Sequence, residues 1–265
     1  MNARRMRWQA LPALVCSMLA LPTVGTAVQA QPACATLTIT GHPSYPPVAW
    51  AVKGAIVGAA PDLVRGIAAG LGVKTVVSKD FGSWEAAQAA ARDGKADVIF
   101  GIYKNDARAL YLDYIDSPFM ADPVAVVVRK GAGFAFGEWD TLKGRRGVTN
   151  EGESYGDTFD AYMAKELTVA RAPGVGKAFA ALLAGQADYM IVGLYPGRDE
   201  ARRLRIAAKV EFLPKELVSA GMFVAFAKKS RCGALRAGFA AQLKAAVDGG
   251  KVPPLLKAAD RKAAQ

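Results

Sequence analysis

Residues 84–100, with the sequence WEAAQAAARDGKADVIF, decide the fold class of this chain. The alanine-rich run from Trp84 to Asp93 predicts a helix. Gly94 predicts its end, because glycine readily adopts the left-handed conformation that follows a helix. The stretch from Asp97 to Phe100, which is apolar after its first residue, predicts a buried strand directly afterwards. A helix followed by a buried strand is the repeating unit of parallel sheets covered by helices, so this stretch predicts an α/β fold.

The same unit precedes this stretch. A strand is expected over residues 37–40, followed by a helix over residues 61–71 that opens with Pro61 and closes at Gly72. Residues 74–78 predict a second strand of the same sheet.

The pattern restarts near Pro123. Further strands are predicted at residues 124–129, 146–149, 187–192 and 222–227, and further helices at 155–165, 175–184, 200–205 and, as a long final helix, 232–248. Two series of units predict two lobes, each a mostly parallel sheet flanked by helices. One lobe comprises residues 31–122 and 217–265, and the other comprises residues 123–216. We expect a ligand cleft between them, because small molecules usually bind at such interfaces.

The first thirty residues have the composition of a secretory signal. They contain a basic start (Arg4, Arg5 and Arg7), an apolar stretch over residues 11–21, and small residues up to Ala30. A membrane anchor is the alternative, but this apolar stretch is shorter than the roughly 20 residues that a spanning helix needs. We therefore predict a signal peptide over residues 1–30, export to the periplasm, and a mature chain that does not span the membrane.

The charge balance is basic. The chain has 34 Lys and Arg residues against 23 Asp and Glu residues, and loss of the predicted signal leaves a net charge of +8. The basic residues are spread along the sequence, with one dense group at Arg202, Arg203 and Arg205. This spread favours a generally basic surface over a nucleic-acid interface, and export also argues against nucleic acid as a partner.

Cysteine and histidine are scarce. The predicted mature chain keeps Cys34 and Cys232, and an oxidising compartment favours a disulfide between them over two separately buried thiols. With His42 as the only histidine, a zinc site of the usual Cys/His type cannot be assembled, and no cofactor is predicted. The sequence has neither a Walker loop nor a Gly-x-Ser-x-Gly elbow, so nucleophilic hydrolysis has no support.

Short segments along nearly the whole predicted mature chain resemble one family in order and spacing. They are Thr40 to Pro47, Val57 to Leu63, Asp93 to Ile99, Ala107-Arg108, Ser117 to Phe119, Leu142 to Val148 and Leu182 to Asp188. The chain resembles bacterial extracellular solute-binding proteins of family 3, which serve polar amino-acid ABC importers. The resemblance implies the two-lobed fold of type 2 periplasmic binding proteins and a monomer that is not an enzyme. It also implies an inner-membrane ABC permease as partner.

The resemblance also implies roles for individual residues. Arg108 matches the arginine that grips a ligand carboxylate, which suits the planar fork of donors on a guanidinium group. Tyr45 and Phe81 match aromatic positions that pack on the ligand. Ser154 matches a hydroxyl residue that reaches the carboxylate near a helix N-terminus. The alternatives are a surface arginine, ordinary core aromatics and a simple N-cap serine.

Other positions depart from the family pattern. Gly193 stands where the family has the acidic residue for the ligand's α-ammonium group, and Tyr103 replaces a small hydroxyl residue. Together with the gain of His42 and Lys104, these changes suggest a di-acid or another amine-poor carboxylate as ligand. Glu153 could still supply the missing negative charge, so an amino acid stays open.

Two other functions stay open. Periplasmic lyases that act on cyclohexadienyl carboxylates resemble this fold, and Glu153 with His42 could form a general acid and base. A receptor that reports its ligand to a membrane sensor would have the same sequence features as a transport protein.

Overall fold

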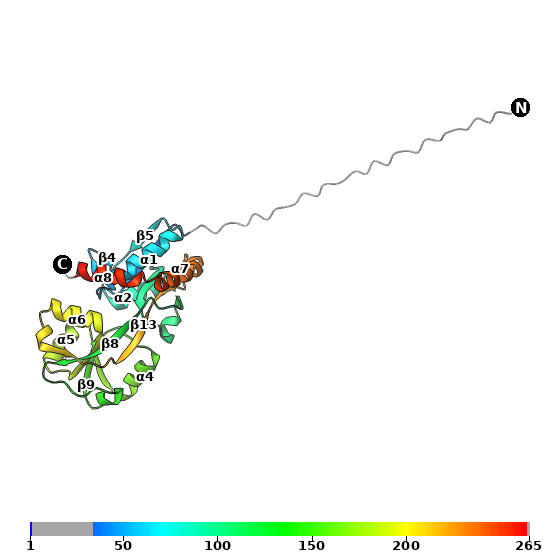
Figure 1. Ribbon diagram of the computed structural model, residues 1–265. Coiled ribbons are helices and arrows are strands. Elements are labelled where there is room, and N and C mark those ends of the chain that lie inside the picture. Colours follow the sequence, from blue (N-terminus) through cyan, green and yellow to red (C-terminus); the bar gives the residue numbers. More distant parts are fainter. Residues whose placement is uncertain (2–33, 264–265) are drawn as a thin grey trace. The chain divides into compact units, whose positions relative to one another are not determined.

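The computed structural model describes Met1 and residues 34–263 (Figure 1). Apart from Met1, the predicted signal peptide lies outside the described residues. Within the described part of the chain, no helix is both long and apolar enough to span a bilayer.

The first lobe is built on three parallel strands. β1 (Thr36–Gly41) lies between β5 (Thr75–Ser78) and β6 (Val98–Ile102), with Leu37 opposite Val76 and Ile39 opposite Val98. Leu37 and Ile39 are fully buried. The helices of this lobe in its N-terminal part are α1 (Ala59–Gly70), α2 (Trp84–Arg92) and the short α3 (Asp106–Ala109). A small separate sheet consists of β2 (Ser44–Tyr45), β3 (Ala49–Val52) and β4 (Ala55–Val57).

The second lobe repeats the plan. Its parallel strands are β9 (Arg146–Asn150), β10 (Thr168–Ala172) and β11 (Tyr189–Gly193), and β12 (Val210–Phe212) adds an antiparallel strand. Its helices are α4 (Asp157–Glu166), α5 (Val175–Leu183) and α6 (Leu194–Arg203). Short 3-10 turns occur at Trp139–Leu142 and Ala207–Lys209.

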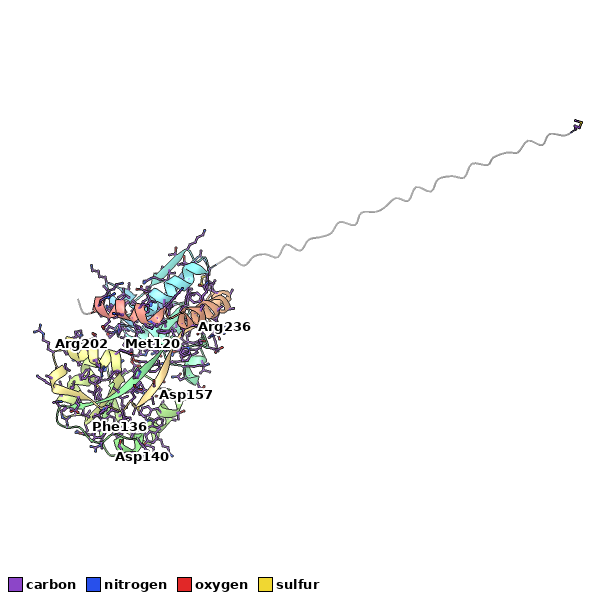
Figure 2. All side chains as sticks on the ribbon, in the orientation of Figure 1. Met120, Phe136, Asp140, Asp157, Arg202 and Arg236 are labelled. Carbon is purple, nitrogen blue, oxygen red and sulfur yellow. A yellow bond between two sulfur atoms is a disulfide. The ribbon has the colours of Figure 1, made fainter. Side chains whose placement is uncertain are left out.

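Two long antiparallel strands belong to both lobes. β8 (Met120–Arg129) and β13 (Val218–Ala227) pair with each other through the register Asp122 to Ala220. The C-terminal part of β13 also pairs with β6 and with β7 (Leu112–Tyr114) of the first lobe, whereas β8 pairs with β11 of the second. In Figure 2, Met120 marks the start of β8, and Phe136 and Asp140 lie farther along in the second lobe. We call β8 and β13 the hinge strands.

The C-terminal segment returns to the first lobe. It contains the 3-10 turn Gly233–Leu235, α7 (Arg236–Asp248) and α8 (Val252–Ala263), and both helices pack against α1. The helix expected over residues 232–248 ends at Asp248 as predicted, but it begins at Arg236 and is not the last one, because α8 follows Gly249 and Gly250. Pro253 and Pro254 lie in the first turn of α8, where the missing amide donors carry no penalty.

The helix expected at residues 200–205 also begins earlier, at Leu194, with Pro196 in its first turn. The α/β class and the order of the other main elements are confirmed.

The predicted disulfide is present. Cys34 and Cys232 are bonded, with their Cα atoms 5.3 Å apart across a sequence separation of 198 residues. The bond ties the segment before β1 to the start of the C-terminal helices, and so links the two chain segments that complete the first lobe.

Candidate functional site

A cavity of about 310 Å³ is lined by side chains from both lobes. His42, Ser44 and Trp84 line it from the first lobe, and Asn150 and Glu151 from the second. Larger hollows of about 420 and 480 Å³ lie elsewhere, around Trp139 and Tyr162 and between α1 and α8. The cavity shared by the lobes is next to the predicted site residues, so we take it and its buried surroundings as the candidate site.

Arg108 is buried between the lobes. The Asn105 side chain caps α3 by accepting a hydrogen bond from the Arg108 amide at 2.8 Å, which fixes the start of this helix. The guanidinium group donates from Nε to Gln88 Oε1 at 3.1 Å and from Nη1 to the Tyr103 carbonyl at 3.0 Å. It also donates from Nη2 to the Gly152 carbonyl of the second lobe at 3.0 Å. Only 4% of Arg108 is exposed, which excludes the surface-arginine alternative.

Trp84 forms the aromatic wall of the cavity. Its ring lies 5.2 Å from the His42 ring, and the Arg108 guanidinium carbon lies 5.6 Å from its centroid. Trp84 is buried, and its indole Nε1 has no hydrogen-bond partner among the described residues. Phe81 is only partly buried, with Lys79 Nζ 5.0 Å above its ring, and it does not line the cavity. The sequence does not mark Trp84 as a site residue, because its position in the first turn of α2 is explained by the helix alone.

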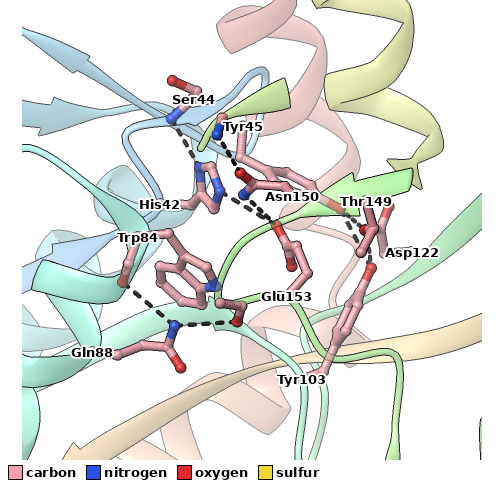
Figure 3. A network of polar contacts seen from close by, with 12 residues as sticks. His42, Ser44, Tyr45, Trp84, Gln88, Tyr103, Asp122, Thr149, Asn150 and Glu153 are labelled. Carbon is pink, nitrogen blue, oxygen red and sulfur yellow. Dashed lines mark hydrogen bonds and ion pairs between the residues drawn. The ribbon is translucent and has the colours of Figure 1, made fainter. Parts of the chain in front are cut away.

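Tyr45, Tyr103 and Asp122 form a buried polar cluster (Figure 3). Both tyrosine hydroxyl groups donate to Asp122 Oδ2, and the two hydroxyl oxygens lie 3.3 Å apart. Burial raises the pKa of both tyrosines well above the usual value, so both remain neutral donors.

Asp122 comes from hinge strand β8 and is fully buried. Burial raises the pKa of its carboxyl group from 3.8 to about 7, although the tyrosine hydrogen bonds oppose the shift. Its Oδ1 has no hydrogen-bond partner within residues 34–263. The sequence does not mark Asp122 as a site residue, because Asp122 directly precedes Pro123, where the strand pattern restarts.

His42 and Glu153 meet across the lobes. His42 Nδ1 accepts a hydrogen bond from the Ser44 amide at 2.9 Å, which places the proton of a neutral imidazole on Nε2. That Nε2 atom lies 3.4 Å from Glu153 Oε1, within ion-pair distance but without the geometry of a hydrogen bond. Asn150 Nδ2 is also 3.5 Å from the same oxygen. The carboxylate of Glu153 therefore reaches from the second lobe toward Trp84, His42 and the tyrosine cluster (Figure 3).

Ser154 bridges the lobes as well. Its hydroxyl accepts a hydrogen bond from Asn105 Nδ2 at 2.7 Å and donates to Asp160 of α4. The N-cap residue of α4 is Gly156, so the simple N-cap alternative for Ser154 is wrong.

Gly193 lies within the candidate site, and Lys104 lies outside it. Gly193 ends β11, and a Cβ atom there would lie 1.8 Å from the Tyr45 hydroxyl oxygen, so Tyr45 occupies the space that a side chain would need. Lys104 lies 3.7 Å from Asp116 in a solvent-exposed ion pair. The structure thus brings together Arg108, Tyr45, Tyr103, His42, Glu153, Ser154 and Gly193, whereas Phe81 and Lys104 lie apart from them.

Comparison with known proteins gives a consistent result. Residues 37–255 match the family model for bacterial extracellular solute-binding proteins, family 3. No protein with a curated description matched the chain.

Several solved structures share the fold. A histidine kinase sensor domain with similarity to periplasmic binding proteins is 24% identical, covers 86% of this chain and 95% of its own, and has a TM-score of 0.68. The L-arginine-bound amino acid ABC transporter substrate-binding protein AbpA of Streptococcus pneumoniae is 19% identical, with coverage of 87% and 97% and a TM-score of 0.69. A mutant of ArgBP from T. maritima is 22% identical, with coverage of 84% and 94% and a TM-score of 0.67.

Proposed function

The chain belongs to the bacterial extracellular solute-binding proteins of family 3, and from this premise we propose that it captures an amino acid or another small carboxylate between its lobes. We propose further that it does so in the periplasm, as a monomer and without catalysis, and delivers the ligand to an ABC permease. The observation that carries the proposal is Arg108, a buried guanidinium group that reaches protein atoms of both lobes.

A carboxylate suits this position better than a neutral group. A guanidinium group has five donors in a planar fork, and within the described part of the chain three of them bind Gln88, Tyr103 and Gly152. The Gly152 carbonyl is the partner that an opening of the lobes would remove. In the open state Arg108 therefore presents Nη2 to an entering carboxylate, which forms stronger, charge-assisted hydrogen bonds than a neutral carbonyl.

Closure then follows from differential affinity. Trp84, Tyr45 and Arg108 receive the ligand on the first lobe, and Ser154 with its neighbours closes from the second. The ligand shifts the lobes toward the closed state only to the extent that it binds that state more tightly. A closed and loaded form is the signal that a permease can distinguish from the empty one.

A thermal-shift screen tests the proposal. The chain without residues 1–30 is screened against amino acids, dicarboxylates and prephenate, and a ligand that binds only the native state raises its melting temperature. We expect at least one small carboxylate to raise the melting temperature, and the effect to disappear in Arg108→Ala. Failure of every small carboxylate to stabilise the wild-type protein would contradict the proposal.

A sensory role is a second candidate, supported by the fold shared with a histidine kinase sensor domain. The chain would then present its closed form to a membrane receptor in place of a permease. Loss of ligand uptake by cells that lack the gene supports the transport role. Unchanged uptake with loss of a ligand-dependent transcriptional response supports the sensory role.

A lyase is a third candidate, supported by the 3.4 Å contact between His42 and Glu153 next to the cavity. It requires conversion of prephenate or arogenate by the purified protein, with loss of that conversion in Glu153→Gln. If prephenate or arogenate raises the melting temperature of the protein without being converted, that compound is a ligand and not a substrate.

A further inference from the structure

The Asp122 carboxylate is half satisfied. Oδ2 accepts hydrogen bonds from Tyr45 and Tyr103, whereas Oδ1 has no partner within the described residues although the side chain is fully buried. A buried acceptor without a donor has lost its hydration and gains no hydrogen bond in return, and the penalty is larger when the acceptor carries charge. Such a group calls for a partner from outside the chain.

The charges around Asp122 identify the kind of partner. The groups that influence it are the neutral hydroxyls of Tyr45 and Tyr103 and the acidic side chains of Glu153 and Glu216. None of the ion pairs formed within residues 34–263 includes Asp122. Above about pH 7, where the Asp122 carboxyl group is ionised, its charge has no positively charged partner among the described residues, and a cation would neutralise it.

Tyr103 connects Asp122 to Arg108. Its carbonyl oxygen accepts a hydrogen bond from Arg108 Nη1 at 3.0 Å, and its hydroxyl group donates to Asp122. One residue thus holds a buried cation at one end and a buried anion at the other. This arrangement is complementary to a ligand that carries both a carboxylate and a positively charged nitrogen.

We propose that Asp122 of hinge strand β8 binds the ammonium group of an amino-acid ligand through its Oδ1 atom. Tyr45 and Tyr103 orient the side chain of Asp122 through hydrogen bonds to its Oδ2 atom. The inference rests on the proposed function, and it favours amino acids over the amine-poor carboxylates that Gly193 suggested. Because the Tyr45 hydroxyl fills the space beside Gly193, the acidic group comes from the hinge strand and not from the end of β11.

The number of protons released on ligand binding distinguishes a ligand-binding role of Asp122 from a purely structural one. Its carboxyl group has a pKa of about 7 without ligand, and an ammonium group bound to the carboxylate lowers that pKa. Binding near pH 6.5 therefore releases a proton from this group. Affinity for an amino acid should fall about tenfold from pH 8 to pH 6, because the carboxylate must first lose its proton.

The test compares amino acids with amine-free acids of the same carbon skeleton. The pairs are L-lysine with hexanoate, L-glutamate with glutarate, and L-leucine with 4-methylpentanoate, measured by calorimetry at pH 6.5 in two buffers that differ in ionisation enthalpy. We expect wild-type protein to prefer at least one amino acid over its partner by more than about tenfold and to release protons on binding it. Asp122→Asn should lose both the preference and this proton release, while Asp93→Asn, which removes an exposed carboxylate, should keep both.

Other outcomes separate the two proposals. Tight binding of an amine-free acid with no preference for its amino acid, or an unchanged preference in Asp122→Asn, overturns the role of Asp122 and leaves the binding function intact. Binding of none of these acids overturns both. If Asp122→Asn does not fold, Tyr103→Phe is the second variant. Loss of one donor should move the pH midpoint of amino-acid binding upward, and an unchanged midpoint contradicts the inference.

Discussion

The Arg108 end and the Asp122 end of the site differ in how completely their polar groups are paired. Arg108 has protein acceptors for Nε, Nη1 and Nη2, one of them on the opposite lobe. Asp122 has donors for one oxygen and none, within the described part of the chain, for the other. The Arg108 end therefore joins the two lobes by a hydrogen bond, whereas the Asp122 end has an acceptor left over, to which we assign the ammonium group of the proposed ligand.

Removal of the Arg108 side chain should have the largest effect on binding. Arg108→Ala deletes the proposed carboxylate-binding group and leaves the Gly152 carbonyl with only the longer hydrogen bond from Gln88 Nε2 at 3.4 Å, so affinity should fall about a thousandfold, or about 4 kcal/mol. Calorimetry with the ligand found by thermal shift measures the loss. Arg108→Lys is the matched control, which retains the charge without the fork and should recover only part of the affinity. Affinity of Arg108→Ala within a few-fold of wild type would disprove the role of Arg108.

The Asp122 end should dominate the pH dependence of stability in the ligand-free protein. Its folded-state pKa of about 7 lies above the unfolded value of 3.8, so the folded state binds the extra proton between these pH values. Its contribution to stability is therefore full below about pH 4 and is lost as pH rises through 7, by about 4 kcal/mol in total.

Urea unfolding at pH 4.5, 6 and 8 tests this sign. Asp122→Asn should remove the decrease in unfolding free energy that this group causes between pH 4.5 and 8, while Asp93→Asn should retain it. If the unfolding free energy of the wild-type protein depends on pH in the same way as that of Asp122→Asn, the raised pKa of the buried Asp122 carboxyl group is contradicted.

Gly193→Ala should displace Tyr45 from its hydrogen bond with Asp122. The new methyl group would lie 1.8 Å from the Tyr45 hydroxyl, so the tyrosine must move away from Asp122. We expect a loss of about 1–3 kcal/mol in unfolding free energy and weaker ligand binding. Adding Tyr45→Phe removes the clashing hydroxyl and should restore part of the stability. A double variant as unstable as the sum of the two single variants would show that no such clash occurs.

Trp84→Phe should have the smallest effect. Phenylalanine keeps an aromatic wall beside Arg108 but removes the indole Nε1, so affinity should fall about three- to tenfold. Phe81→Leu is the control, and it should leave affinity unchanged because Phe81 does not line the cavity. A larger loss in Phe81→Leu than in Trp84→Phe would reverse this assignment.

The sequence predicted the fold where the signals are local. The turn at Gly94 and the alanine-rich helix before it gave α2 and β6 nearly to the residue, because capping and periodicity act within a few positions. The edge strands β10 and β12 and the helix α8 were missed. These elements depend on pairing and packing with distant segments, which a single sequence does not reveal.

The sequence predicts those residues of the candidate site that lie in recognisable family motifs. Arg108 and Tyr45 lie in such motifs, and both lie in the site. Asp122 depends on its register with Ala220 in the other hinge strand, and this pairing brings together positions nearly one hundred residues apart. The orientation of Trp84 toward His42, with Phe81 turned elsewhere, likewise depends on tertiary packing.

A crystal structure with the most stabilising amino acid tests the central claim most directly. We predict that the ligand lies between the lobes, with its carboxylate on the Arg108 guanidinium group and its ammonium group within hydrogen-bond distance of Asp122 Oδ1. A ligand held elsewhere, for example in the hollow between α1 and α8, or an ammonium group that contacts Glu153 while Asp122 Oδ1 stays unpaired, would contradict the account.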